Sequence, residues 1–257
     1  MSTQVITKQL RIHVVGDSLN AGIADVATNR KLRAWPAQLA AQLSQGAQQA
    51  RVVADYAVSG APSPEVLALQ FGRLELMPGD LVCLWAGAND VLRPGCTFAQ
   101  TVDAMQTMFG AIEQAGSTPL TMQLPRISTM LPGPARLMRR WDDYGFAVND
   151  LVARLSARCG GVHLPWSPLP GLSGPDGTHL SAYGHDVYAA RYAAALAPRL
   201  GTIAPPLPPA PQIVTTAAQR RWWYARHGIA WVVRRQFDPP RPIPARPAVE
   251  PVTLSAK

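Results

Sequence analysis

Two short segments, far apart in the sequence, carry the side chains needed to activate a hydroxyl group. The first, residues 16–19, contains Ser18 directly after an apolar run near the N-terminus. The second, residues 176–179, contains Asp176 and His179. A serine, a histidine and a carboxylate can together make the serine oxygen a nucleophile that attacks an ester. The two segments therefore favour acyl chemistry, although each alone has an ordinary structural alternative.

Ser18 stands where a buried strand is expected to end. Residues 12–15 are apolar apart from His13, and Gly16 follows them. At the carboxyl end of such a strand the Ser18 hydroxyl can point into a crevice. Backbone N–H groups of a following helix can then stabilise an oxyanion at the same place. The alternative is that Asp17 and Ser18 only cap a helix.

Asp176 and His179 are joined by a short turn. A turn of this length lets the Asp176 carboxylate reach one ring nitrogen of His179, so that the other nitrogen can accept the proton of Ser18. The alternative is a surface turn before a helix capped by Ser181. A metal site of Asp176, His179 and His185 is disfavoured, because no further ligand cluster accompanies them. We expect His185 to be a hydrogen-bonded or exposed histidine of that helix.

Two turns between these segments contain hydrogen-bond donors for an oxyanion. Residues 58–60 end in Gly60, whose N–H can approach a substrate with no Cβ in the way. Residues 87–90 contain Asn89, whose side-chain amide is a second donor. Each turn is by itself also compatible with an ordinary connection between a strand and a helix.

The elements that must position these residues follow from an alternation of short apolar runs and helix-like segments. We expect strands at residues 12–15, 51–54, 81–85, 119–122 and 161–164. We expect helices at residues 35–43, from Ser63 (as the cap), after Thr97, at 135–158 and at 181–197. Such alternation predicts an α/β fold with a mainly parallel sheet covered on both faces. Functional groups then gather at the carboxyl ends of the strands.

The ordered set of segments resembles the SGNH, or GDSL-type, hydrolases. Four blocks carry the resemblance: GDSL at residues 16–19, Gly60, GAND at residues 87–90 and DGTH at residues 176–179. The resemblance spans residues 10 to about 197 and implies a three-layer α/β/α sandwich with a mainly parallel, five-stranded, flavodoxin-like sheet. The second block departs from the family's frequent Asn-x-Gly-x-Ser-Gly, since residues 55–60 read DYAVSG, but its final Ser-Gly is present.

The resemblance also implies a role for each matched residue. Ser18 would be the nucleophile and, through its N–H, one oxyanion donor. The Gly60 N–H and the Asn89 side chain would complete the oxyanion hole. His179 would act as general base and then as general acid, with Asp176 as its orienting partner. These roles require no metal ion and no organic cofactor.

The expected activity is hydrolysis of carboxylic acyl esters through an acyl-enzyme intermediate. An acyltransferase with the same nucleophile is an alternative, because only the acceptor of the acyl group differs. A binding module that keeps the fold without turnover is another, and the intact set of site residues argues against it.

The substrate is expected to be a small-molecule or lipid acyl ester. The loop at residues 123–138 and the position of the C-terminal segment are expected to set the acyl length. Candidate pocket walls, which are equally compatible with core positions, are Trp85, Leu92, Met130, Leu131 and Trp166.

The composition is that of a globular protein. Of the 257 residues, 47% are hydrophobic and 16% are charged, so a sizeable core is expected. Three cysteines without a CxxC pair argue against a disulfide framework or a zinc site and fit a reducing compartment. No apolar run approaches the roughly 20 residues that span a bilayer, and residues 1–11 have no signal-peptide core. We therefore expect a cytoplasmic protein.

The composition changes at residue 204, where closely spaced prolines predict a stiff, extended linker. We predict a hydrolase domain at residues 1–203 and a Pro- and Arg-rich extension at residues 204–257. Within the extension we expect a helix at residues 215–226 and a short strand at residues 229–233.

The net charge of +8 is concentrated toward the C-terminus. The basic residues there are Arg220, Arg221, Arg226, Arg234, Arg235, Arg241 and Arg246. We interpret them as a solvated tail whose aromatic residues (Trp222, Trp223, Tyr224 and Trp231) pack on the hydrolase domain or on a second subunit. Contact with an anionic membrane surface is an alternative. No nucleic-acid partner is expected, and no oligomeric state is predicted.

Overall fold

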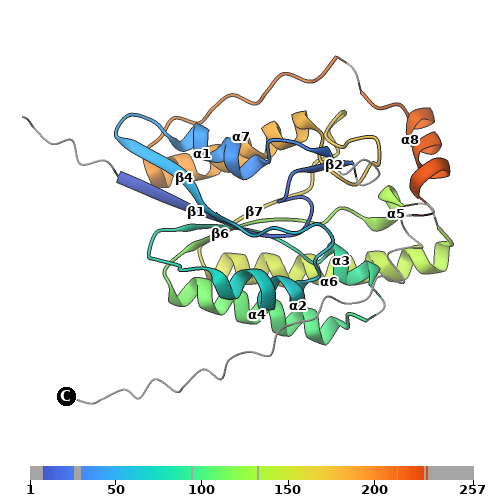
Figure 1. Cartoon of the computed structure of the whole chain (residues 1–257), viewed down its shortest axis with the longest axis horizontal. Helices are drawn as coiled ribbons and strands as arrows, with labels where there is room; N and C mark the ends of the chain where they lie inside the picture. Colours follow the sequence, from blue (N-terminus) through green and yellow to red (C-terminus); the bar gives the residue numbers. More distant parts are fainter. Residues whose placement is uncertain are drawn as a thin grey trace, which may run out of the picture.

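The computed structural model describes residues 8–25, 30–93, 95–131, 133–212, 214–228 and 230. A central sheet lies between two layers of helices (Figure 1). Its five strands are parallel: β1 (Lys8–Gly16), β4 (Gln48–Asp55), β5 (Leu81–Trp85), β6 (Thr118–Met122) and β7 (Val162–Leu164). They lie in the order β4-β1-β5-β6-β7, which is the flavodoxin-like order. The predicted three-layer α/β/α sandwich is confirmed.

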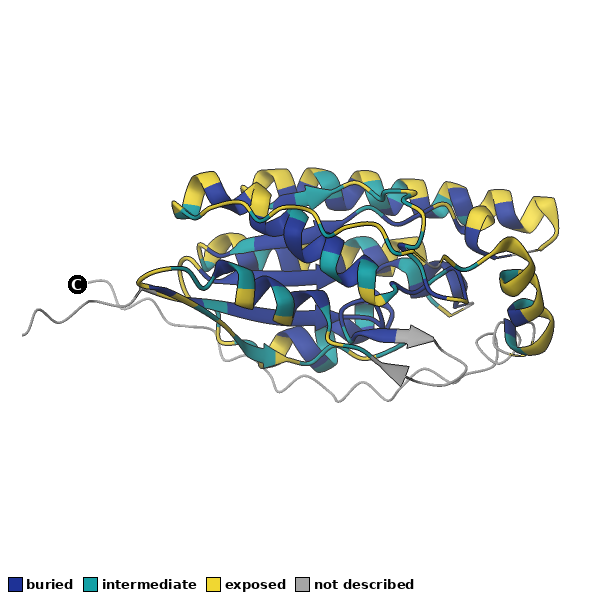
Figure 2. Cartoon of the chain, turned by 90° about the horizontal axis from the view of Figure 1, so that it is seen from above, coloured by how far each residue is buried: buried dark blue, intermediate teal, exposed yellow. Residues whose placement is uncertain are grey.

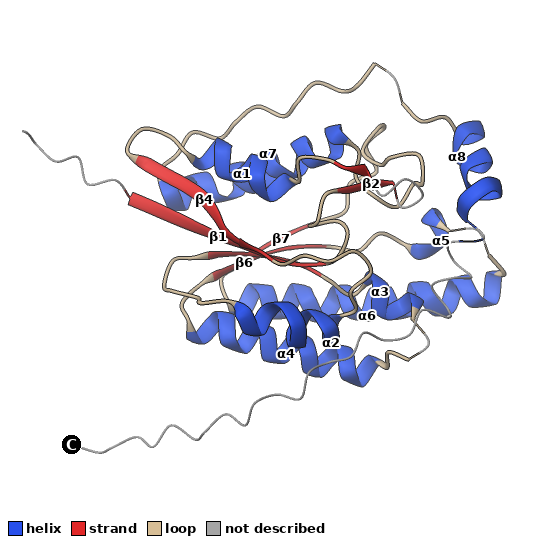
Figure 3. Cartoon of the chain, viewed as in Figure 1, coloured by secondary structure: helices blue, strands red, loops and turns tan. Residues whose placement is uncertain are grey.

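The helices that connect the strands cover both faces of the sheet (Figure 3). One face carries α1 (Trp35–Leu43) and α7 (Ala182–Leu200). The other carries α4 (Phe98–Gln114), α6 (Ala135–Arg158) and the short α2 (Ser63–Glu65). The last continues as a π-helical turn, η1 (Val66–Gln70), and a 3₁₀ turn, η2 (Phe71–Arg73). All five strands and these main helices lie at or within a few residues of the predicted ranges.

Each face of the sheet has its own core cluster, because successive side chains of a buried strand point to opposite faces of the sheet. In β1, Val14 packs under α1 and α7, whereas Val15 packs under α4 and α6. In β5, Leu84 joins the second cluster and Trp85 the first. Figure 2 shows buried residues concentrated along the sheet, with exposed residues on the outer sides of the helices and in the loops. Coverage on both faces explains why the strands read as continuous apolar runs.

Several short elements near the carboxyl ends of the strands are not predicted by the sequence patterns. They are the two-stranded ribbon of β2 (Ile23–Asp25) and β3 (Arg30–Lys31), and the helices α3 (Ala88–Leu92) and α5 (Ile127–Met130). Each is too short to show a period of its own.

The prediction that Ser63 caps its helix is wrong. The capping position is Pro62, and the N–H of Ser63 donates to both carboxylate oxygens of Asp90, at 2.9 and 3.1 Å. A distant carboxylate therefore takes the place of a local cap, because an acidic side chain also satisfies the free N–H groups of a helix start.

The C-terminal segment returns to the carboxyl ends of the strands. After residue 201 the chain crosses the α1/α7 side and reaches α8 (Ala217–Trp223), which stands beyond those ends (Figure 1). Thr216 and Gln219 form a reciprocal capping box at its start, and the π-helical turn η3 (Tyr224–Gly228) follows. The predicted helix of this region is thus present. The predicted strand at residues 229–233 lies outside the described residues except for Ala230, and the division of the chain at residue 204 remains a prediction.

Within the described residues, none of the helices combines the length and apolarity that a bilayer crossing requires.

Candidate active site

The turn that carries Ser18 is held by the end of β1. Gly16 has a φ of 130°, and a Cβ on it would lie 2.1 Å from the carbonyl oxygen of Trp85, so only glycine fits. The side chain of Gln70 accepts from the Gly16 N–H (2.7 Å) and donates to its carbonyl (3.0 Å). The backbone leaving the sheet is therefore fixed immediately before the serine.

A buried asparagine also holds the turn that carries Ser18. Asn20 is fully buried, and its Nδ2 donates to the carbonyl oxygens of Val15 (2.7 Å) and Cys83 (3.1 Å). Its Oδ1 accepts from the indole N–H of Trp35 at 2.9 Å. One side chain thus ties together β1, β5 and α1. Because a buried amide is costly to leave unpaired, these bonds give the turn one favoured position.

Ser18, His179 and Asp176 form one hydrogen-bonded chain. The Oγ of Ser18 lies 2.7 Å from Nε2 of His179, and Nδ1 of His179 lies 2.6 Å from Oδ2 of Asp176. The second carboxylate oxygen accepts from the backbone N–H groups of Thr178 and His179, both at 2.9 Å. The side chains of Ser18, His179 and Asp176 are all buried. The loop geometry therefore fixes the carboxylate, and the carboxylate fixes the imidazole ring.

The charge state of Asp176 follows from its surroundings. Burial raises the pKa of this carboxyl, but its hydrogen bonds with His179 and the charge of that ring outweigh burial, so the net shift is downward. Asp176 is therefore an anion at neutral pH, acts as an acceptor only, and holds the proton on Nδ1 of His179. The nitrogen that faces Ser18 is left to accept a proton.

Donors for an oxyanion lie in three turns. Within the described residues, the backbone N–H groups of Ser18 and Gly60 donate to no acceptor in the protein. Nδ2 of Asn89 donates one hydrogen to Oδ2 of Asp17 (3.1 Å) and has a second hydrogen to offer. The other carboxylate oxygen of Asp17 accepts from the N–H of Leu19 at 3.0 Å. Asp17 thus joins the turn after β1 to the start of α3.

The Gly60 turn is anchored on both sides. The N–H of Val58 donates to the carbonyl oxygen of Gly16 (3.0 Å), which sets this turn beside the end of β1. Gly60 has a φ of 80°, a conformation that favours glycine. Its carbonyl accepts from Nη2 of Arg93 at 2.9 Å, and Nη1 of the same arginine pairs with the buried Glu65 at 3.3 Å. With its carbonyl held in this way, the orientation of the Gly60 peptide is defined.

The structure separates the other candidate residues by location. His185 is buried in α7, where Nδ1 accepts from the N–H of Trp35 at 3.3 Å, and burial lowers its pKa to about 4. His185 therefore stays neutral, and it is not one of the residues hydrogen-bonded in series with Ser18. Among the described residues, no group of three or more His, Cys, Asp or Glu side chains is arranged to hold a metal ion.

The candidate pocket walls divide in the same way. Trp85 is a core residue, stacked on Trp35 with 4.8 Å between ring centroids. Trp166 is half-buried and packs on the same cluster. Met130 and Leu131 line a cavity beside α8, and Leu92 packs with them beneath it.

Sequence patterns miss several residues that hold the site. Gln70 lies in an irregular helical turn, and Arg93 has no local signal beyond its charge. Asp17 adjoins the serine, which is the one signal available for it. Tyr224, from the C-terminal segment, places its hydroxyl 2.7 Å from the carbonyl oxygen of Asp176. Each acts through a contact distant in sequence, which local periodicity does not record.

Residues 14–187 match the model of the GDSL-like Lipase/Acylhydrolase family. The chain belongs to this family. The match includes both segments that carry the Ser18, Asp176 and His179 chain, together with the Gly60 and Asn89 turns. Membership makes this GDSL-like protein a carboxylic ester hydrolase. No curated protein matches its sequence.

Solved structures with the same fold include several esterases. A carbohydrate acetylesterase from Sinorhizobium meliloti superposes with a TM-score of 0.54 at 18% identity, over 74% of this chain and 99% of that one. An acetylxylan esterase from Geobacillus stearothermophilus superposes with a TM-score of 0.51 at 14% identity, over 78% of this chain and 98% of that one. A psychrotrophic esterase from Pseudoalteromonas sp. superposes with a TM-score of 0.51 at 16% identity, over 75% of this chain and 99% of that one. At these identities the likeness is one of fold.

Proposed function

We propose that this GDSL-like hydrolase cleaves carboxylic acyl esters through an acyl-enzyme on Ser18. The observation that carries the proposal is the continuous hydrogen-bonded chain from Ser18 Oγ through His179 to Asp176. Those distances are within the range at which a base can take a proton from a nucleophile. The three groups are also held by the backbone of two different turns, so their alignment does not wait for a substrate.

In the acylation step, Ser18 Oγ bonds to the ester carbonyl carbon while its proton passes to Nε2 of His179. The imidazolium that forms is stabilised by the Asp176 anion. The carbonyl oxygen becomes an oxyanion, to which the N–H groups of Ser18 and Gly60 and the Asn89 amide donate. The bond to the alcohol oxygen then breaks, and the alcohol leaves with the proton from His179.

In the deacylation step, His179 removes a proton from a water molecule as that water attacks the acyl carbon. The same three donors hold the second oxyanion. When the bond to Ser18 Oγ breaks, the serine oxygen regains its proton from His179 and the carboxylic acid is released. The enzyme returns to its starting protonation state, so no external oxidant, reductant or cofactor enters the cycle.

The substrate class of the proposal is a small acyl ester. Two of the structures with the same fold are described as esterases of acetylated carbohydrates, which makes short acyl groups the first class to assay. A series of p-nitrophenyl esters of increasing acyl length, assayed together with acetylated xylan, measures this preference.

The test of the acyl-enzyme is covalent labelling. A fluorophosphonate probe is expected to modify the chain once, on Ser18, as mapped by mass spectrometry of the digested protein. With p-nitrophenyl acetate, a burst of p-nitrophenol equal to the enzyme concentration is expected when acyl-enzyme accumulates. Labelling at another residue, or ester hydrolysis by a protein whose Ser18 remains unmodified by the probe, would rule out the proposed nucleophile.

Asn89→Ala is expected to lower kcat by about 10²–10³-fold, because one oxyanion donor is lost. KM is expected to change little, since the donor acts on charge that develops in the transition state rather than on the bound ester. Steady-state kinetics on p-nitrophenyl acetate, with a thermal melt to verify folding, measures both. A raised KM at unchanged kcat would instead place Asn89 in substrate binding.

A further inference from the structure

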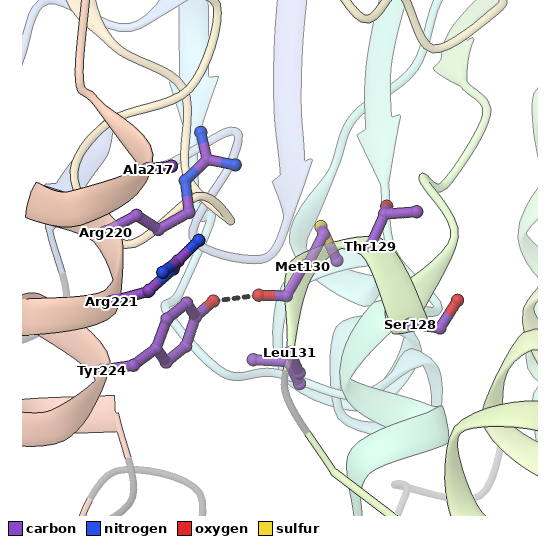
Figure 4. A pocket seen from close by; sticks show the side chains of 8 residues that line it. All are labelled: Ser128, Thr129, Met130, Leu131, Ala217, Arg220, Arg221 and Tyr224. Atoms are coloured by element: carbon purple, nitrogen blue, oxygen red, sulfur yellow. Dashed lines mark hydrogen bonds between the residues drawn. The ribbon is translucent and has the colours of Figure 1, made fainter. Parts of the chain in front are cut away.

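A cavity of about 470 Å³ lies between the segment at residues 128–131 and the C-terminal helix α8. Met130 and Leu131 form one wall, and Arg220, Arg221 and Tyr224 form the other (Figure 4). The arginine side chains extend from α8 toward the opposite wall (Figure 4). The cavity is therefore part apolar and part cationic, and it exists only because the C-terminal segment returns to this end of the sheet.

The cationic wall is attached directly to the loop of Asp176 and His179. The Tyr224 hydroxyl lies 2.7 Å from the Asp176 carbonyl oxygen and also hydrogen-bonds the carbonyl of Met130. A Cβ on Gly177 would lie 3.2 Å from Cδ and from Nε of Arg220, so the arginine passes close over the loop. One wall of the cavity thus contacts the loop that carries Asp176 and His179, and its two walls are joined by one tyrosine.

Within the described residues, no acidic side chain neutralises the positive charge of this wall. In the part of the chain that the structure describes, neither Arg220 nor Arg221 forms an ion pair, and the buried Nε of Arg220 has no hydrogen-bond partner. The carboxylate of Asp176 is taken by His179. The carboxylate of Asp142 accepts from the Ser128 hydroxyl and pairs with Arg126. Two guanidinium groups therefore face the cavity with unused donors.

We propose that this cavity is a subsite for an anionic group of the ester substrate, a carboxylate or a phosphate remote from the scissile bond. The inference rests on the proposed esterase function of Ser18. Guanidinium groups suit such an anion, because each can donate two parallel hydrogen bonds to its oxygens. Met130 and Leu131 provide contact for the hydrocarbon that separates the anion from the ester. The Tyr224 hydroxyl, which bonds the carbonyl oxygens of Asp176 and Met130, holds the two walls in place around the anion.

The test compares kcat/KM within matched pairs of substrates that differ in charge. For an anion on the acyl side, the pair is p-nitrophenyl hemisuccinate and p-nitrophenyl butyrate. For an anion on the alcohol side, para-acetoxybenzoate and para-acetoxyphenyl phosphate are each compared with para-acetoxybenzamide. In at least one pair the anionic member is expected to be preferred, and added salt is expected to reduce that preference.

Arginine variants assign the preference to the cavity. Arg220→Gln and Arg221→Gln are each expected to lower kcat/KM for the preferred anionic ester about tenfold, which is the range of one charged hydrogen bond. The neutral partner ester is expected to change less than about twofold. Arg226→Gln removes the same charge from the same segment but lies over the ring of Trp222, outside the cavity, and is expected to leave both rates unchanged. Because Arg221 is exposed, its variant is expected to fold even if the Arg220 variant does not.

Loss of the subsite and loss of the proposed function give different results. Ser18-dependent hydrolysis of neutral esters with no charge preference in any pair would overturn the subsite alone, as would equal losses on neutral and anionic esters in both arginine variants. If Ser18 proves not to be needed for hydrolysis, calorimetry of the wild-type enzyme with para-acetamidobenzoate, which keeps the anion of para-acetoxybenzoate but has an amide in place of the ester, still measures the subsite. Binding that is unaffected by Arg220→Gln and Arg221→Gln would then overturn it.

Discussion

Ser18→Ala is expected to reduce kcat for p-nitrophenyl acetate on the order of 10⁵–10⁶-fold, while leaving the fold intact. The hydroxyl that is removed supplies the bond to the acyl group, and in the part of the chain that the structure describes Ser18 Oγ, at 2.7 Å, is the one hydrogen-bond partner of His179 Nε2. A residual rate above the uncatalysed reaction is expected, because the oxyanion donors and substrate binding remain. Stopped assays with high enzyme concentration measure the residual rate.

Ser44→Ala is the matched control for this variant. Ser44 ends α1, where its hydroxyl bonds the carbonyl oxygens of Ala40 and Ala50 at the opposite end of the sheet. The control is expected to retain full activity. Thermal melts of Ser18→Ala are expected to show a folded protein, since its hydroxyl bonds only a side chain. Activity of Ser18→Ala above about 1% of the wild type would contradict the nucleophile assignment.

Asp176→Asn is expected to lower kcat about 10⁴-fold. The Asn oxygen can still accept from the N–H groups of Thr178 and His179, so the loop keeps its two backbone bonds. Its NH₂ group then faces Nδ1 of His179 and donates where the carboxylate accepted. The ring must accept at Nδ1 and carry its proton on Nε2, the nitrogen that faces Ser18. The base is thus in the wrong tautomer although every residue is in place.

The pH dependence of stability provides an independent check on Asp176. The pKa of its carboxyl is lowered in the folded protein, so the carboxylate adds stability that is fully present above its unfolded pKa of about 4. That contribution is lost as the pH falls through the lower pKa of the folded state. Urea unfolding is therefore expected to show a stability difference between wild type and Asp176→Asn that shrinks below pH of about 4. A difference that is constant with pH, or an Asn variant with more than a tenth of wild-type kcat, would contradict the assigned role.

The positions of the principal site residues follow from sequence because each belongs to a local pattern. Ser18 lies two residues after the end of β1, Asn89 lies in the first turn of the short helix that follows β5, and the Asp176–His179 turn directly precedes a capped helix. In a parallel sheet the carboxyl ends of all strands lie at the same edge, so residues that follow those ends can be expected to lie close together from the sequence alone. Alternation of strands with helices was likewise enough to predict both layers of helices, since a two-sided core requires continuous apolar strands.

The supports of the site could not be predicted in this way. Gln70 reaches both backbone groups of Gly16 from a π-helical turn, and Asp90 replaces the expected cap at Ser63. Arg93 holds Gly60 while paired with Glu65. These are polar contacts between segments distant in the sequence. Neither hydrophobic periodicity nor residue type predicts which distant group a polar side chain will bond.

By itself, the sequence predicted the fold and the proposed site residues, a serine, a histidine and a carboxylate in ordered blocks on an α/β frame, because turns and strand ends are local features. Only the tertiary structure decided where residues 204–228 lie. A proline-rich connection has no hydrophobic periodicity and no apolar face, so its local sequence does not predict which part of the domain the following helix packs on. Packing brings α8 onto the Asp176–His179 loop, where Tyr224 and Arg220 contact it and two arginines line a cavity. The proposed reaction could be predicted from local segments of the sequence, whereas the charge of the cavity near the proposed site arose from packing.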